Sequence, residues 1–143
     1  MAEAPFVHGF EVRLHDTDAA GVLFFAHLLR HAHDAYESLM AAAGFPLQDL
    51  IRQGTALPIV HAEADFQVPM RQGDRVRVEV SLSEIRHRSF SLDYRFLDTA
   101  GAQRARARTV HVLADADGSQ PLPDALRQAL VQWGVPQGPE APV

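Results

Sequence analysis

The spacing of apolar residues predicts one long helix early in the chain. An apolar stripe at intervals of three or four residues runs through positions 22–43, consisting of Phe24, Leu28, Ala32, Tyr36 and Leu39. This is the spacing of one helical face. Gly44 and Pro46 follow, and both are typical of the point at which a helix ends. The pattern therefore predicts a helix with one buried face.

After residue 57 the period changes from that of a helix to that of a strand. Residues 75–85 alternate most regularly, with Val76, Val78 and Val80 separated by charged side chains. Further strands are predicted over residues 6–14, 57–68, 89–97 and 103–113, and short helices over 47–54 and 123–133. A long apolar helix followed by consecutive antiparallel strands packs most simply when the sheet curls around the helix. The predicted fold class is therefore α+β, a curved antiparallel sheet wrapped around one long central helix.

Length and composition limit the number of domains and exclude several kinds of catalytic chemistry. The chain has 143 residues, enough for one domain with its own core. We expect this domain to cover residues 1–133, followed by a flexible tail rich in proline and glycine at 134–143. The sequence contains no cysteine, and all 13 basic residues are arginine. Thiolate metal sites, cysteine nucleophiles and lysine Schiff bases are thereby excluded.

Charge is distributed unevenly along the chain. The net charge is −5, yet residues 71–108 hold nine arginines against five acids, and the remainder holds four against 13. The basic segment suits an anionic ligand such as a phosphorylated one, or it is a solvated strand face. The overall acidity argues against a nucleic-acid partner.

The sequence also bears on where the chain is expected to act. No apolar run approaches membrane-spanning length, so we expect no membrane insertion. The first residues lack the basic and apolar regions of a signal peptide, so we expect the cytoplasm.

The segment from Asp16 to Phe25 carries the most informative chemistry. Asp16 and Asp18 precede the predicted helix, beside the small residues Ala19, Ala20 and Gly21. A helix N-terminus presents unpaired N–H groups that can hold a developing oxyanion. A neighbouring carboxylate can act as nucleophile or as general base toward water, and the two together suit acyl transfer. The alternative is that one of the aspartates only caps the helix.

These residues lie in a recognisable pattern. The stretch DTDAAGVLFFAH (16–27), with PIVHAEADFQVPMRQGD (58–74), resembles the hotdog-fold acyl-CoA thioesterases of the 4-hydroxybenzoyl-CoA thioesterase family. The resemblance spans residues 7–123 and is strongest to the 1,4-dihydroxy-2-naphthoyl-CoA hydrolase branch. The segments that favour this branch are HDAYESLM (33–40), ALPIVHAEADF (56–66), RARTVHV (106–112) and PLP (121–123).

The resemblance implies roles for individual residues. Asp18 matches the family's catalytic carboxylate, the backbone N–H of Phe25 its oxyanion donor, and Gly21 the glycine that keeps the backbone open at the thioester. Whether Asp18 attacks the carbonyl or activates water stays open at this point.

The resemblance also implies how coenzyme A is held. Arg86, Arg88 and Ser89 match the family's phosphate contacts, and PLPDA (121–125) stands where related enzymes carry a further arginine. We further expect His27 and His61 to contact substrate.

The implied function is hydrolysis of an aromatic acyl-CoA, with 1,4-dihydroxy-2-naphthoyl-CoA of menaquinone and phylloquinone synthesis as the best match. The alternatives are 4-hydroxybenzoyl-CoA, another aryl-CoA or a short-chain acyl-CoA as substrate, a hotdog hydratase, or a non-catalytic acyl-CoA binding protein. The family implies a homodimer, and often a homotetramer, with the site between protomers. It implies no cofactor beyond the coenzyme A of the substrate. His27, His31 and Asp34 have a spacing that could bind a metal, but this family needs none.

Overall fold

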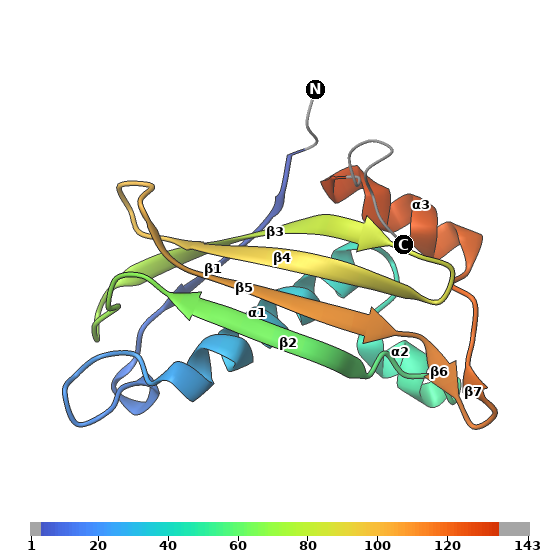
Figure 1. The fold of residues 1–143 in the computed structure, drawn as a ribbon, viewed down its shortest axis with the longest axis horizontal. Helices are drawn as coiled ribbons and strands as arrows, with labels where there is room; N and C mark the ends of the chain where they lie inside the picture. Colours follow the sequence, from blue (N-terminus) through green and yellow to red (C-terminus); the bar gives the residue numbers. More distant parts are fainter. Residues whose placement is uncertain (1–3, 135–143) are drawn as a thin grey trace.

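The computed structural model describes residues 4–134, in which a curved sheet packs against a long helix (Figure 1). The main sheet consists of β1 (Phe6–Glu11), β2 (Ile59–Phe66), β3 (Arg75–Ile85), β4 (Ser89–Leu97) and β5 (Gln103–Val112). The helices are α1 (Phe25–Ala42), α2 (Leu47–Arg52) and α3 (Asp124–Leu130). The predicted α+β class is confirmed. The predicted tail lies, apart from Gly134, outside the described residues.

All neighbouring strands of the main sheet are antiparallel, in the order β1-β3-β4-β5-β2. Glu11 of β1 pairs with Arg75, so the segment leading to Asp18 leaves the sheet beside the start of β3. We call this the loop end. The opposite end carries the β3–β4 turn, residues 86–88, and we call it the arginine-turn end. The register thus places residues 16–25 and residues 86–89, both predicted to bind substrate, at opposite ends of the sheet.

One face of α1 supplies the centre of the core. Its buried residues recur at helical spacing and are Leu28, His31, Ala32, Ala35, Tyr36, Leu39 and Met40. The inward side chains of β3 alternate as predicted, and Val76, Val78 and Val80 are buried against this helix face. Phe24 departs from the predicted stripe, because it precedes the helix and remains 38% exposed.

Some helices and strands begin or end at other residues than predicted, because local hydrogen bonds favour a different backbone conformation there. The first strand stops at Glu11 because a 3-10 turn forms over Leu14–Asp16. The long helix begins at Phe25, since Leu23 N–H instead donates to the Met70 carbonyl at 2.7 Å. A small hairpin that the sequence did not predict, β6 (Ala114–Asp115) and β7 (Gly118–Ser119), follows β5. A second 3-10 turn, Val131–Trp133, extends α3. Within residues 4–134, no helix has the length and apolar character needed to cross a membrane.

Candidate active site

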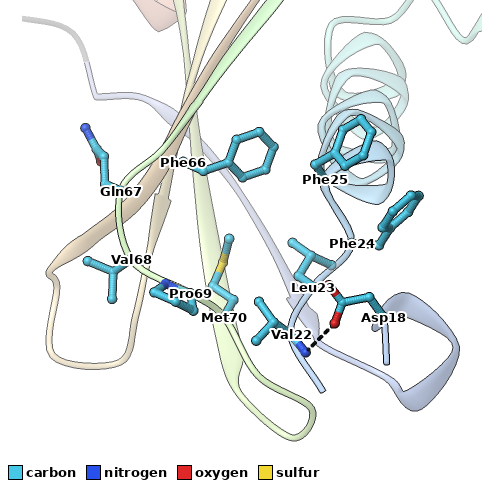
Figure 2. Close-up of a pocket in the computed structure, with 10 residues that line it drawn as sticks. All are labelled: Asp18, Val22, Leu23, Phe24, Phe25, Phe66, Gln67, Val68, Pro69 and Met70. Carbon is cyan, nitrogen blue, oxygen red and sulfur yellow. Dashed lines mark hydrogen bonds between the residues drawn. The ribbon is translucent and has the colours of Figure 1, made fainter. Parts of the chain in front are cut away.

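A cavity of about 470 Å³ opens at the loop end of the sheet, between the residues before α1 and those after β2. Figure 2 shows Phe25 and Phe66 facing one another across this space. The volume lies in the usual range for small-molecule sites, roughly 300–1,000 Å³. Its apolar lining residues are Val22, Leu23, Phe24, Phe25, Phe66, Val68, Pro69 and Met70, and its polar ones are Asp18 and Gln67.

Asp18 brings a carboxylate to the wall of this cavity. Its Oδ1 atom accepts hydrogen bonds from the N–H groups of Ala20 at 2.9 Å and Val22 at 3.3 Å. The second of these bonds is drawn in Figure 2. Within residues 4–134, Oδ2 has no hydrogen-bond partner, so one oxygen orients the carboxylate while the other is available for chemistry.

The loop that carries Asp18 is a small hairpin. Asp18 N–H donates to the Val22 carbonyl at 2.9 Å, and Gly21 N–H donates to the Asp18 carbonyl at 3.0 Å. Gly21 adopts a φ of +76°, and a Cβ there would meet no atom within 4 Å. The turn therefore needs glycine for its backbone conformation. The role at the thioester that the resemblance implies for Gly21 stays a prediction.

The N-terminus of α1 lies beside the same cavity. Phe25 is its first helical residue, and no side chain caps the preceding Phe24. The first N–H groups of a helix have no intrahelical acceptor, and the helix dipole gives this end a partial positive charge. Within residues 4–134, Phe25 N–H has no acceptor, and its role as the oxyanion donor stays a prediction. The alternative that Asp16 or Asp18 caps this helix does not hold.

The two aspartates of the motif lie in opposite environments. Asp18 is exposed, whereas Asp16 has an exposed fraction of 0%. Burial alone would raise the pKa of Asp16, but the hydrogen bond from Arg13 N–H and the nearby His31 and Arg30 hold it below its usual value. Asp16 is therefore a charged, inaccessible group, and Asp18 is the carboxylate that a ligand can reach.

The predicted phosphate contacts lie far from Asp18 within this chain. Arg86, Arg88 and Ser89 belong to the arginine-turn end. The 11 residues of β3 separate the two ends, which corresponds to about 35 Å of extended strand. Arg86 Nε donates to Glu84 at 2.9 Å, and Arg88 donates to the Ser119 carbonyl. One chain does not bring these residues to its own cavity.

The two predicted substrate histidines also lie outside the cavity lining. His61 is on the outer face of β2, where its Nε2 lies 2.8 Å from Glu63 Oε1. Phe66 lies on the inner face of the same strand and lines the cavity. His27 lies in the first turn of α1, with its ring 5.8 Å from that of Phe24 and Nδ1 3.5 Å from Arg30 Nε. Within the described part of the chain, no cluster of three or more possible ligands could hold a metal.

The opposite wall of the cavity is the part that sequence reasoning missed. Phe66, Val68 and Met70 come from the end of β2 and the segment after it, more than 40 residues from Asp18. Alternation along residues 57–68 groups Phe66 with Ala62 and Ala64 on one face of the strand, but nothing in it indicates which loop lies opposite. The hydrogen bond from Leu23 to Met70 brings the two segments together.

A cavity that places a carboxylate beside an uncapped helix N-terminus is an arrangement suited to acyl transfer. Residues 12–130 match the family model described as the thioesterase-like superfamily. The chain belongs to this family. The predicted hotdog family and the predicted class of enzyme, a thioester hydrolase, are thereby confirmed.

Individual relatives resemble this chain over most of its length. A 1,4-dihydroxy-2-naphthoyl-CoA hydrolase from Synechococcus elongatus is 41% identical over 123 residues, 83% of this chain and 90% of that protein. The crystal structure of a 1,4-dihydroxy-2-naphthoyl-CoA thioesterase from Synechocystis has a TM-score of 0.83 at 36% identity, covering 87% of this chain and 94% of that one. A gentisyl-coenzyme A thioesterase structure has a TM-score of 0.82 at 31% identity, covering 87% and 98%.

Proposed function

We propose that this protein hydrolyses the thioester of 1,4-dihydroxy-2-naphthoyl-CoA. The observation that carries the proposal is Asp18 and the Phe25 N–H at one wall of an apolar cavity. The names of the relatives support the substrate. The 1,4-dihydroxy-2-naphthoyl and gentisyl groups share a feature, an aromatic ring with two hydroxyls para to each other and the acyl carbon next to one of them. This ring is the class of acyl group we propose for the site.

In the proposed reaction, the thioester carbonyl oxygen accepts a hydrogen bond from Phe25 N–H. The carbonyl carbon is attacked either by Asp18 Oδ2 or by a water from which Asp18 takes a proton. The C–S bond then breaks, and coenzyme A leaves as a thiolate that takes up a proton. Where Asp18 attacks, water cleaves the resulting anhydride. In both versions the N–H stabilises negative charge that develops on the oxygen, which is typically worth about 3 kcal/mol.

The proposed site includes a second copy of the chain. β2 is an edge strand, and Ile59, Val60 and Phe66 are at least 40% exposed. An unpaired apolar edge is a template for another strand. Antiparallel pairing of two β2 strands, which would make the homodimer predicted from the resemblance, brings Ile59 of one copy toward Phe66 of the other.

Pairing of this kind would also bring Arg86 and Arg88, which lie far from Asp18 within one chain, to a cavity. In each chain Ile59 and Ser89 lie at the same end, because Ile59 pairs with His111 and Ser89 with Val112. The arginine turn of the second copy then lies near the cavity of the first. Arg86, Arg88 and Ser89 would hold the coenzyme A phosphates across the interface, where arginine suits phosphate by its two parallel donors. Assembly into a homotetramer stays a prediction.

The test is release of thiol from a panel of CoA thioesters by the parent and by Asp18→Asn. The panel is 1,4-dihydroxy-2-naphthoyl-, gentisyl-, 4-hydroxybenzoyl-, benzoyl-, phenylacetyl-, acetyl- and palmitoyl-CoA. We expect the first to have the highest kcat/KM and Asp18→Asn to lower kcat by about 1,000-fold. Asp93→Asn, on the outer sheet face, is the matched control.

Preference for an acyl-CoA without ring hydroxyls would overturn the proposed substrate. Binding without hydrolysis by the parent would favour the acyl-CoA binding protein. Full activity of Asp18→Asn would show that another residue carries out the reaction.

A further inference from the structure

The loop between β1 and α1 is held as a hairpin whose base is Asp16. The Asp16 carbonyl accepts from Phe24 N–H at 2.9 Å, and Thr17 forms an antiparallel bridge with Leu23. Asp18 follows two residues later on one side of this hairpin, and Phe25 follows Phe24 on the other. Asp16 therefore lies at the point that joins the segment carrying Asp18 to the segment carrying Phe25.

The side chain of Asp16 ties the same base to α1. Its Oδ2 accepts from Arg13 N–H at 2.9 Å, and its Oδ1 accepts from the Arg30 guanidinium. Oδ1 also lies 3.3 Å from His31 Nε2. Arg30 and His31 both belong to α1, so this carboxylate connects the hairpin to the helix that begins at Phe25.

The partners of Asp16 are themselves held in place. The His31 ring stacks on Phe10 of β1, with centroids 3.7 Å apart and an interplanar angle of 8°. Burial lowers the pKa of His31 more than the charge of Asp16 raises it, so the ring stays neutral at neutral pH. Arg30 also approaches Asp34, with 3.7 Å between Nη1 and Oδ2. The carboxylate of Asp16 thus connects β1, the hairpin and α1 in one place.

We propose that Asp16 is a positioning residue, which fixes the Asp18 carboxylate relative to the Phe25 N–H. This inference rests on the proposed function. Because Asp16 is fully buried, it acts through these two groups and does not touch substrate. Reacting groups must be held closely, since a misplacement of about 1 Å can reduce a rate by about 100-fold.

The first variant is Asp16→Asn. The amide nitrogen of Asn is a donor, and it would face either Arg13 N–H or the Arg30 guanidinium, which are donors as well. We expect kcat for 1,4-dihydroxy-2-naphthoyl-CoA to fall by about 100-fold with KM changed less than about threefold. Arg30→Gln, at a half-exposed position, should lower kcat by about tenfold. Glu37→Gln makes the same kind of change at an exposed acid of the same helix, outside the contacts of Asp16, and should leave kcat unchanged.

Two readouts separate positioning from general stability. In the Asp18→Asn background, Asp16→Asn should lower the residual rate by less than about tenfold, because groups that act as a unit are not additive. Hydrogen exchange should quicken at the amides of Val22 and Phe24, which close the hairpin, and stay unchanged in Glu37→Gln.

The outcomes distinguish the two proposals. A parent without thioesterase activity overturns the proposed function, while exchange at Val22 and Phe24 still tests the role of Asp16. Unchanged kcat or unchanged exchange in Asp16→Asn overturns the positioning role alone. A full 100-fold loss in the Asp18→Asn background also overturns it, because Asp16 would then act elsewhere.

Discussion

The two ends of the main sheet differ in whether their polar groups have hydrogen-bond partners within the chain. At the loop end, Asp18 and Phe25 line an apolar cavity, and one oxygen of Asp18 and the N–H of Phe25 have no partner in the part of the chain that the structure describes. At the arginine-turn end, the charged side chains have partners within the chain: Arg86 bonds to Glu84, and Arg127 donates to the Arg86 carbonyl.

This difference indicates which end of the sheet can carry out the reaction, and at which end existing contacts must break before a ligand binds. Unpaired donors and acceptors beside an apolar space can act on a substrate without first breaking other bonds. Arg86, already paired with the Glu84 carboxylate, must exchange that partner for a phosphate, and the exchange limits the net gain. The loop end is therefore expected to govern kcat, and the arginine-turn end KM.

The sharpest test of the loop end is Phe25→Pro. Proline is well tolerated at the first position of a helix, and the preceding Phe24, at φ −68° and ψ 135°, already has the conformation that proline requires. The variant removes the N–H without removing the helix. We expect kcat to fall by about 100- to 1,000-fold relative to Phe25→Ala, which lacks the ring but keeps the donor. Equal kcat in the two variants would show that this N–H is not the oxyanion donor.

The two edge strands provide the next comparison, because the proposed site needs β2 of a second copy but not β1. Val60→Glu places like charges close together in a β2–β2 interface, which typically costs several kcal/mol. We expect a monomer at micromolar concentration, measured by sedimentation, with reduced activity. Val7→Glu makes the same change on β1, where the side chain is similarly exposed, and should leave the oligomeric state unchanged. If Val60→Glu remained a dimer with parental activity, the proposed pairing of two β2 strands would be wrong.

The core near the arginine-turn end predicts a dependence of stability on pH. Burial lowers the pKa of His111 to about 4, and its ring stacks on Tyr36 at 4.1 Å. The unfolded chain takes up a proton near pH 6.5 and the folded one only near pH 4. Stability is therefore highest above pH 6.5 and decreases as the pH falls toward 4, by about 3 kcal/mol in total.

Urea unfolding at pH 7.5 and pH 4.5 measures this decrease. His111→Phe keeps the stacked ring and should remove most of the decrease. Part of the remainder comes from His31, whose pKa burial also lowers. The same decrease in the variant as in the parent would show that His111 does not titrate in this range.

The smallest expected effect concerns the arginine turn. Arg86→Met should raise KM for the CoA thioester by about tenfold and leave kcat unchanged, because a hydrogen bond between charged groups is worth about 1.5 kcal/mol. Arg106→Met, which removes an arginine paired with Asp65 on the outer face, serves as the control. An unchanged KM in Arg86→Met would assign the arginine turn a structural role only.

Much of the fold was predictable because the patterns that encode it are local. The bounds of β3 and β4 match their predicted ranges, since alternation reports directly which side chains face a core. The start of α1 was predicted three residues early. Val22 and Leu23 fit the helical spacing, but their backbone bonds to segments near Met70 override it.

The site was predictable only where its parts are neighbours in sequence. Asp18, Gly21 and Phe25 lie within eight residues, and the structure places Asp18 and Phe25 at the cavity, with Gly21 in the turn that carries Asp18. Arg86 and His61 are distant in sequence, and their proposed contacts depend on which strands pair and which face is inward. His61 lies on the outer face because Phe66, five residues later on the same strand, faces inward.

The elements, the class of fold, the family and the short motif before the helix could all be predicted from the amino-acid sequence. Periodicity, turn residues and motif spacing are properties of consecutive residues. Only the tertiary structure decided which of the two aspartates is reachable, because burial of Asp16 depends on Arg30, His31 and Phe10 meeting from two elements. It also decided the second wall of the cavity and the separation of the arginine turn from Asp18, because strand order and register join residues that are far apart in the chain.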